Sequence, residues 1–537
     1  EEPIEDKLTV QFGRQPNIDC SFDFHLNFKS WRTAWVAYER DMEGTPHPEM
    51  DFITIQAPAA ADGGTIYFDQ MVLSTPIDPR YHTRDAQVPF VNLEADDAAG
   101  SHWMGMYHFS QLKPFDGIQQ NITDAELRAF HHIEKKVEED ICLAHQAGTD
   151  ELSHTEWRSI SEQFGSYGIS MDKGKISGRP VHLIHLVDMY PPACRASLLE
   201  LVNPINMKEY TDFLFTIAIA YRSKMEQDKR EELERMFIHL LLHMQDQGWA
   251  FGSSLGTVHH IGYNLKGLYP AIYLMRDPIK AYSLELFDEM RRMLYWYSGA
   301  GRIYTPTDEI EGNIDIFNTT IHGMLISLLL LENGPQKSTA LHHFSRWLSQ
   351  SLRPAPGLRA AYKVDGSAYH HVNHYPAYAI GGFDGVTPIV YFLSGTPYQI
   401  AADAHGTLRK ALLAMRLYSN KYQWLVSLSA RHPTGLGELS LPPFKYMTLA
   451  SISSHQQGVD EEMASAYLRL LPEGEDESTR TLLQARGIAP ELDPNGHWTM
   501  NYAVLGLHRR KHWLVGVRGH SRYLWSHETY MKNNLYG

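Results

Sequence analysis

The chain of 537 residues contains only three cysteines, Cys20, Cys142 and Cys194, and they lie far apart in the sequence. Three scattered thiols are too few for a disulfide framework and form no CxxC metal-binding motif. We therefore expect buried, unpaired thiols, which is the usual state of a free cysteine.

Long apolar runs are also missing. The longest covers residues 324–331, whereas a membrane-spanning helix needs roughly 18 apolar residues. The sequence opens with EEPIED and lacks the basic and apolar regions of a signal peptide. These absences predict no membrane span, and they indicate either a cytosolic chain or a mature form that has already been processed.

Positive charge is scarce: 48 Lys and Arg stand against 63 Asp and Glu, giving a net charge of -15. A chain without an overall basic field is not expected to bind nucleic acid or an anionic membrane, so an acidic ligand would need a local basic pocket. With 43% hydrophobic and 21% charged residues, the composition is that of a globular protein, and its length predicts several domains.

The order of sequence patterns is β, then α, then β. Residues 65–68 and 88–91 are short β-prone runs in an N-terminal part that fits a sandwich of jelly-roll type. Thr123 and Glu126 form a capping-box pattern that opens a helix to about residue 145. Residues 498–504 and 513–517 are alternating or β-branched runs, and we expect β structure from residue 442 onward.

The central part, from about residue 116 to 440, has helical periodicity separated by Gly- and Pro-containing turns. The expected helices cover residues 210–224, 230–244, 284–297, 319–331, 337–352 and 401–418. Stacked antiparallel helix pairs of this kind can form a toroid with a long cleft on one rim. The final strands look unfinished, so we expect that a C-terminal portion is absent.

The densest cluster of chemically active side chains is residues 369–378, YHHVNHYPAY. His370 and His374 have the HxxxH spacing of a zinc site, but His371 stands where a metalloprotease has Glu, and Pro376 argues against a helix. A loop that joins an imidazole and a phenol is a credible proton-transfer unit.

Residues 371–378, with 364–367 and 395–398, closely resemble the active-site region of chondroitin sulfate ABC lyases, members of the hyaluronate and chondroitin AC lyase family. Residues 418–420 with 430–433 resemble the segment that bears the family's catalytic Arg, and residues 525–530 resemble the one that bears its Glu. The resemblance implies a multidomain α+β chain: an N-terminal jelly-roll domain (1–115), an incomplete α/α toroid (116–440) and the beginning of an antiparallel β-sandwich (441–537). It also implies a secreted or periplasmic protein.

The implied reaction is β-elimination, in which the C5 proton of a uronic acid is removed while the oxygen at C4 departs. The enzyme must neutralise the uronate carboxylate, supply a base and protonate the leaving oxygen. By resemblance, Tyr378 is the base and acid, Arg431 the fixed charge, His371 a second base or carboxylate partner, and Glu528 the residue that orients them. For each, a purely structural role is the alternative.

A second base is needed if the C5 epimer iduronate is also a substrate, and His260, with His259 beside it, is the candidate. A core or capping His pair is the alternative. Other candidate substrate-binding residues are His370, Asn313, Asn318 and the sugar-stacking Trp249. Asn318 is equally well explained as a helix N-cap, and Trp249 as a core residue.

The function predicted from the sequence is therefore cleavage of chondroitin sulfate and of dermatan sulfate, with a glycosaminoglycan as the partner molecule. Alternatives are a lyase or hydrolase for another uronic-acid polysaccharide, such as hyaluronan, alginate or a heparin-type chain, and a non-catalytic glycosaminoglycan-binding protein. The chemistry requires no cofactor. A divalent cation such as calcium is a candidate structural or activating ion, with Asp69 and Asp85 as candidate residues.

Overall fold

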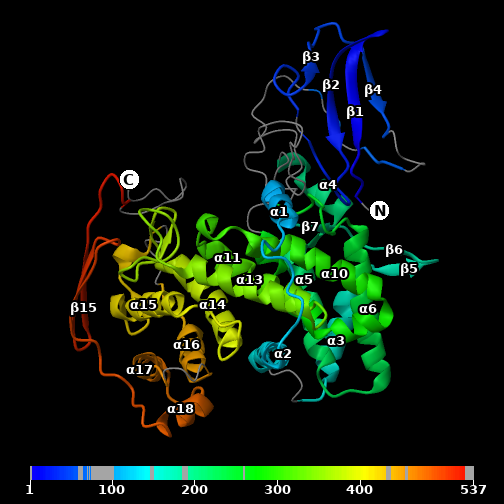
Figure 1. Ribbon diagram of the computed structural model, residues 1–537. Coiled ribbons are helices and arrows are strands. Elements are labelled where there is room, and N and C mark those ends of the chain that lie inside the picture. The colour runs from blue at the N-terminus through cyan, green and yellow to red at the C-terminus, as the bar shows by residue number, and fades with distance from the viewer. Residues whose placement is uncertain are drawn as a thin grey trace. The chain divides into compact units, whose positions relative to one another are not determined.

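The computed structural model describes residues 3–34, 36–58, 65–68, 71, 73, 102–145, 150–183, 192–257, 261–430, 437–453 and 458–525. The chain divides into two compact units (Figure 1). The first comprises Glu1–Gln111 and Ile141–Gly301, and the second comprises Leu112–Asp140 and Arg302–Gly537.

The first unit begins with an antiparallel sheet whose described strands have the order β3-β2-β1-β4. These are β1 (Lys7–Arg14), β2 (Asn17–His25), β3 (Glu43–Gly44) and β4 (Phe52–Gln56). Leu8, Val10 and Phe12 alternate along β1 and are buried, as the period of two in a strand requires. The N-terminal part is thus β, but residues 65–68 form no strand, which corrects one expected run; residues 88–91 lie outside the described residues.

Helices and short strands complete the first unit. They are α1 (His102–Gln111), α3 (His154–Ser166), β5 (Ser170–Asp172), β6 (Lys175–Ser177), β7 (Val181–His182), α4 (Pro192–Val202), β8 (Ile205–Asn206), α5 (Met207–Tyr221), α6 (Gln227–Asp246), α7 (Ile261–Leu265), α8 (Leu268–Leu274), α9 (Arg276–Tyr282) and α10 (Leu284–Ser298). In α6 the side chains of Leu233, Phe237, Leu240 and Met244 are buried at intervals of three and four residues. This spacing places them on one face, so the helical period predicted this element correctly.

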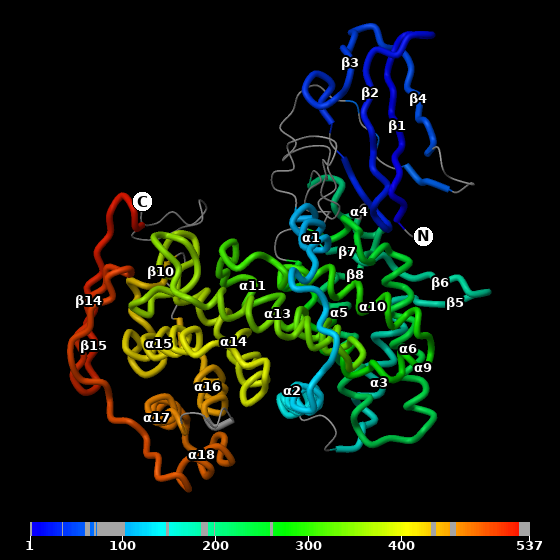
Figure 2. The backbone as a smooth tube through the Cα atoms, viewed as in Figure 1, coloured from blue at the N-terminus to red at the C-terminus, as the bar shows by residue number. Residues whose placement is uncertain are grey.

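The second unit contains most of the remaining helices, and in the tube of Figure 2 α2 is cyan whereas the later helices run from green to orange. They are α2 (Asp124–Ala144, the last four residues of which belong to the first unit), η2 (Ala300–Tyr304), η3 (Thr307–Glu309), α11 (Ile314–Thr319), α12 (Ile321–Leu329), α13 (Pro335–Leu352), α14 (Pro376–Leu393), α15 (Ala402–Tyr418), η4 (Val426–Leu428), α16 (Pro442–Ser453), α17 (Glu461–Leu470) and α18 (Glu477–Gln484). The helix expected at 319–331 corresponds to α12, and a further helix, α11, precedes it and ends at a C-cap on Thr320, whose φ and ψ are -114° and -14°.

A three-stranded sheet follows α18. β13 (Gly496–Met500), β14 (Leu505–Arg510) and β15 (Trp513–Arg518) form an antiparallel sheet in that order. The expectation of β structure directly after residue 441 is therefore wrong, because the first described elements there are the helices α16, α17 and α18. Their buried faces pack against neighbouring helices, and this tertiary packing decides the structure of short apolar runs that a strand could also use.

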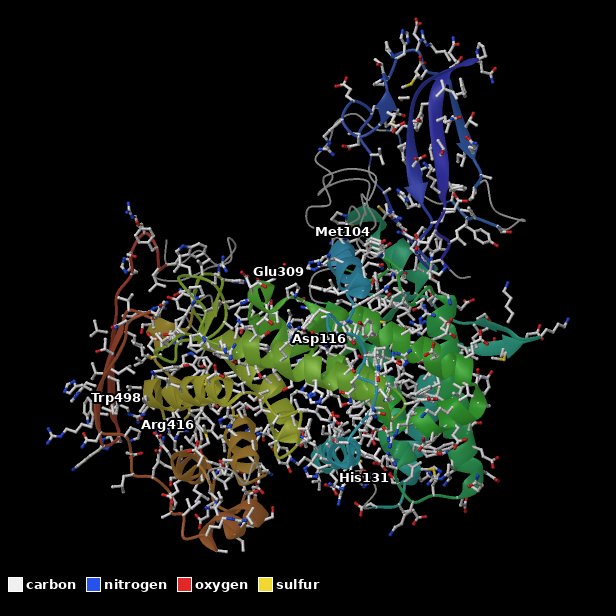
Figure 3. All side chains as sticks on the ribbon, in the orientation of Figure 1. Met104, Asp116, His131, Glu309, Arg416 and Trp498 are labelled. Carbon is white, nitrogen blue, oxygen red and sulfur yellow. The ribbon has the colours of Figure 1, made fainter. Side chains whose placement is uncertain are left out.

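A buried arginine attaches this sheet to the helices. Arg509 on β14 is 1% exposed and donates to the carbonyl oxygens of Arg416 at 2.9 Å and Ser419 at 2.7 Å. These carbonyls lie at the C-terminal end of α15, where helical oxygens lack partners within the helix. Figure 3 labels Arg416 on α15 and Trp498 on β13, the strand beside β14.

The three cysteines are free thiols, as expected, but only Cys20 is buried, whereas Cys142 and Cys194 are partly exposed. A search of the described helices finds none that is both long enough and apolar enough to span a bilayer.

The capping box at the start of α2 is confirmed. The backbone N–H of Thr123 donates to Glu126 at 2.7 Å, and the N–H of Glu126 donates to the Thr123 hydroxyl at 3.2 Å. Ser338 donates to the same carboxylate at 2.7 Å, and His342 contacts it at 2.8 Å. Burial alone would raise the pKa of Glu126, but these hydrogen bonds prevail and lower it to about 2.

We expect Glu126→Gln to lower the free energy of unfolding at neutral pH by at most about 3 kcal/mol. A carboxylate with a depressed pKa stabilises the fold above its unfolded pKa, and this contribution is lost as the pH falls toward 2. Urea unfolding of parent and variant between pH 7 and pH 3 measures the difference. Glu139→Gln, a substitution at an exposed position of the same helix, is the control. If the loss of unfolding free energy in Glu126→Gln did not become smaller in acid, the lowered pKa of Glu126 would be contradicted.

Candidate active site

Two of the predicted site residues, His370 and His371, lie on a β-hairpin that has a two-residue turn. Strand β9 (Tyr369–His370) pairs with β10 (Asn373–His374), and His371 and Val372 form the turn. Their φ angles are 48° and 62°, as a type I′ turn requires. A β-branched residue rarely adopts positive φ, so Val372 carries backbone strain. Strain of this kind persists only where the surrounding structure holds it, and it is frequent at functional sites.

Helix α14 begins immediately after the hairpin and brings Tyr378 to His371. Pro376 occupies the first turn of α14, a position where its missing N–H costs nothing. The ring centroid of Tyr378 lies 5.1 Å from that of His371 and 4.1 Å from that of His370. The predicted pairing of an imidazole with a phenol is thus present, and the segment before Pro376 is not helical, as expected.

The hairpin is anchored from behind by buried side chains. The Nδ1 atom of His374 accepts a hydrogen bond from the Ala368 N–H at 3.1 Å. Burial first, and the charge of Arg518 second, lower the pKa of His374 to about 4, so this imidazole is neutral at pH 7. The hydroxyl of Tyr369 donates to the Tyr502 carbonyl. His374 therefore supports the hairpin, and its Nδ1 is directed at the backbone and not at a metal site shared with His370.

An acidic residue that the sequence analysis did not single out lies beside His370. The Oδ2 atom of Asp315, on α11, is 3.4 Å from Nε2 of His370, whose side chain is 11% exposed. Asp315 lies in the polar, Gly-containing segment 311–318, between the candidate substrate-binding residues Asn313 and Asn318, but nothing in the local pattern indicated a partner 55 residues later.

The two asparagines of this segment have different roles. Asn313 is the N-cap of α11, and its Oδ1 accepts from the N–H of Asp315 at 2.8 Å and of Ile316 at 3.4 Å. The expected cap at Asn318 is wrong, because α11 starts at Ile314, five residues before the expected helix start at residue 319. Asn318 lies inside α11, in close contact with α14: a Cβ added to Gly381 would be 2.6 Å from its amide group.

Glycines allow α11 to approach α14 this closely. A Cβ at Gly385 would lie 1.7 Å from the Phe317 carbonyl oxygen. Tyr378, Gly381 and Gly385 are spaced by three and four residues and therefore share one face of α14. The face that carries Tyr378 is thus the face against which Asn318 is packed.

The chain segment before Arg431 is also fixed. Strands β11 (Ser419–Asn420) and β12 (Gln423–Trp424) form a second short hairpin. The N–H of Trp424 donates to the Gly437 carbonyl at 3.2 Å, which holds Gly437 beside the hairpin. A Cβ at Gly437 would overlap the Trp424 ring at 1.8 Å, so only glycine fits here.

Comparison with known families matches two domain models to this chain. The model described as "Lyase, catalytic" covers residues 118–477, and the one described as "Lyase, N terminal" covers residues 1–90. The chain belongs to this lyase family.

Among curated proteins, a chondroitin sulfate ABC exolyase of Bacteroides thetaiotaomicron is 37% identical over all of this chain and 54% of its own length. A chondroitin sulfate ABC exolyase of Proteus vulgaris is 31% identical, again over all of this chain and 54% of the relative. The chain thus spans about half the length of the curated relatives it matches. A solved xanthan lyase of Paenibacillus has a TM-score of 0.50 at 12% identity, covering 74% of this chain and 38% of that one, which indicates a similar fold.

Four of the predicted site residues of this lyase lie outside the described residues: Arg431, Glu528, His259 and His260. The same holds for the candidate cation residues Asp69 and Asp85. Within the described parts of the chain, no group of three or more His, Cys, Asp or Glu side chains is arranged to hold a metal ion.

Trp249 is not a sugar-stacking residue. Its side chain is 0% exposed, and its ring packs on Tyr297 with centroids 5.3 Å apart. Gly256 lies against the same indole, where a Cβ would be 2.4 Å from the ring. The alternative weighed for this tryptophan, a core position, is the correct one, because a wholly buried indole offers no surface to a ligand.

Proposed function

We propose that this lyase cleaves chondroitin sulfate, and also dermatan sulfate, by β-elimination at the uronic acid, giving 4,5-unsaturated oligosaccharides. The observation that carries the proposal is the His371–Tyr378 pair, an imidazole and a phenol with ring centroids 5.1 Å apart on a strained hairpin. The substrate class comes from relatives named chondroitin sulfate ABC exolyases. A hydrolase would instead need paired carboxylates flanking the bond and a positioned water.

The proposed division of roles follows the requirements of elimination. Tyr378 removes the C5 proton and returns a proton to the leaving oxygen, while Arg431 neutralises the uronate carboxylate. His371 assists as second base or carboxylate partner, and Glu528 orients the cationic groups. Asn318 is proposed to hydrogen-bond the substrate, because it lies against the face of α14 that carries Tyr378. His370 is proposed to bind substrate beside Tyr378.

The proposed surroundings of this site are those of the family resemblance: a jelly-roll N-terminal domain, an incomplete α/α toroid and an antiparallel β-sandwich, in a secreted or periplasmic protein. We propose that elimination needs no cofactor. A divalent cation such as calcium would serve as a structural or activating ion.

The direct test is ultraviolet absorbance after incubation with chondroitin sulfate, with and without a chelator. A C4–C5 double bond conjugated with the carboxylate absorbs where the intact polymer does not. We expect this band to grow with time, and reducing ends that form without the band would instead indicate hydrolysis. Binding without either product would favour a non-catalytic glycosaminoglycan-binding protein.

We further propose His260 as the base for iduronate. Glucuronate and iduronate differ only in configuration at C5, so one bound ring presents its acidic proton to opposite sides and a single base cannot serve both. We expect His260→Ala to reduce cleavage of dermatan sulfate by about 100-fold or more and to leave chondroitin sulfate much less affected. His259→Ala is the neighbouring control. Equal losses on both substrates would show that the histidine pair is structural.

A further inference from the structure

A partly buried arginine and a buried asparagine join the candidate hairpin to the C-terminal sheet. Arg518 is the last residue of β15, and its Nη2 donates to Oδ1 of Asn373 at 2.6 Å. Asn373 is 3% exposed and lies on β10, two residues after His371. A hydrogen bond with a charged donor is roughly twice as strong as a neutral one.

The same guanidinium holds a second segment. Its Nη1 donates to the carbonyl oxygen of Ser427 at 2.6 Å, in the short helix η4. The inward face of β15 lies directly on this segment, because a Cβ at Gly516 would be 2.0 Å from Leu425 Cδ1. Ser427 is four residues before Arg431, the proposed catalytic arginine. Arg518 therefore holds the segment that precedes Arg431 in the sequence.

Asn373 extends the link to a third segment. While its Oδ1 accepts from Arg518, its Nδ2 donates to the carbonyl oxygen of Trp525 at 3.2 Å. Trp525 is three residues before Glu528. The side-chain amide of Asn373 therefore connects Arg518 with the segment before Glu528. Its oxygen accepts a hydrogen bond from Arg518, and its nitrogen donates one to Trp525.

We propose that Arg518 and Asn373 are positioning residues of the active site, which hold the hairpin of His371 and the segments before Arg431 and Glu528 in one arrangement. The inference deepens the proposed function and rests on it. The three segments are separated by tens of residues in sequence, and elimination requires their side chains to converge on one sugar ring. A displacement of about 1 Å in a catalytic group can cost on the order of 100-fold in rate.

The geometry explains why the position holds arginine. Its planar fork presents two separate Nη groups, one to Asn373 and one to Ser427. A lysine ammonium is a point charge on a flexible stem and does not reproduce two fixed directions. We therefore expect Arg518→Lys, which keeps the charge, to recover little of the activity lost in Arg518→Ala.

The test is a double-mutant cycle on kcat with chondroitin sulfate. We expect Arg518→Ala and Asn373→Ala each to lower kcat by about 10- to 100-fold with KM changed by less than about threefold, and the double variant to be no worse than either. Arg510→Ala, an exposed change on neighbouring β14, should leave kcat unaltered. Losses in kcat that multiply in the double variant, or a fully active Arg518→Lys, would overturn the proposal. Should Arg518→Ala fail to fold, Arg518→Lys takes its place in the cycle.

A second measurement does not depend on catalysis. Amide hydrogen exchange of the intact protein should show faster exchange in both 369–375 and 425–430 when Arg518 is replaced, whereas Arg510→Ala should change neither. Unaltered exchange in one or both segments would refute the bridge, whatever the activity. If the parent protein forms no unsaturated product but the exchange result holds, the proposed function fails while the structural bridge stands, so the two failures are distinguishable.

Discussion

Tyr378→Phe is expected to lower kcat by about 100- to 10,000-fold and to leave KM nearly unchanged. The substitution removes only the hydroxyl that transfers the proton. The ring remains, and with it the packing on His370 and His371, whose centroids lie 4.1 Å and 5.1 Å away. Steady-state kinetics with chondroitin sulfate, followed by the absorbance of the unsaturated product, measures the effect.

Tyr391→Phe provides the matched control. It removes a tyrosine hydroxyl from the same helix, α14, at the end remote in sequence from the hairpin. Tyr391 packs on Tyr446 with centroids 5.9 Å apart, and we expect its replacement to leave kcat within about twofold of the parent. A Tyr378→Phe enzyme within about threefold of the parent rate would remove Tyr378 from proton transfer.

Gly385→Ala is expected to destabilise the fold by about 2 to 4 kcal/mol. The added methyl group would lie 1.7 Å from the backbone oxygen of Phe317, and a backbone cannot move aside as the end of a side chain can. The helices α11 and α14 must therefore separate, which also displaces Asn318 from the face of Tyr378. Urea unfolding measures the loss, and activity should fall in the fraction that remains folded.

Gly406→Ala tests the opposite situation. This glycine lies within α15, and no atom is within 4 Å of where its Cβ would be. Alanine has the higher helix propensity, so we expect a gain of about 0.5 to 1 kcal/mol. Equal destabilisation by the two substitutions would show that close helix packing at Gly385 is not the cause.

Local signals predicted the elements that depend on neighbouring residues alone. The capping box of Thr123 and Glu126 involves residues three apart, and the structure contains it as expected. The helical period located α6, α13 and α15 to within a few residues. Pro376 argued against a helix at residues 370–374, and that segment is not helical, but α14, which begins at Pro376, was not predicted.

Predictions failed where packing against residues distant in the sequence outweighs the local preference for a helix, strand or cap. Residues 442–453 and 461–470 are helical because their apolar side chains pack on other helices, although short apolar runs also suit strands. Asn313 rather than Asn318 caps α11, and the break at Thr320 was not visible in the apolar pattern. Trp249 could have been a surface or a core residue, and its burial depends on the ring of Tyr297, which is 48 residues away.

For the candidate site, the sequence by itself determined the chemical groups and the family: the motif at 369–378 contained the imidazole and the phenol, and it was recognisable without coordinates. Only the tertiary structure shows which distant residues hold the hairpin that carries these groups. Asp315 meets His370, and Arg518 meets Asn373 across 145 residues of chain. No spacing rule links such residues, because their contact energy is realised only after the chain has folded and its loops have closed.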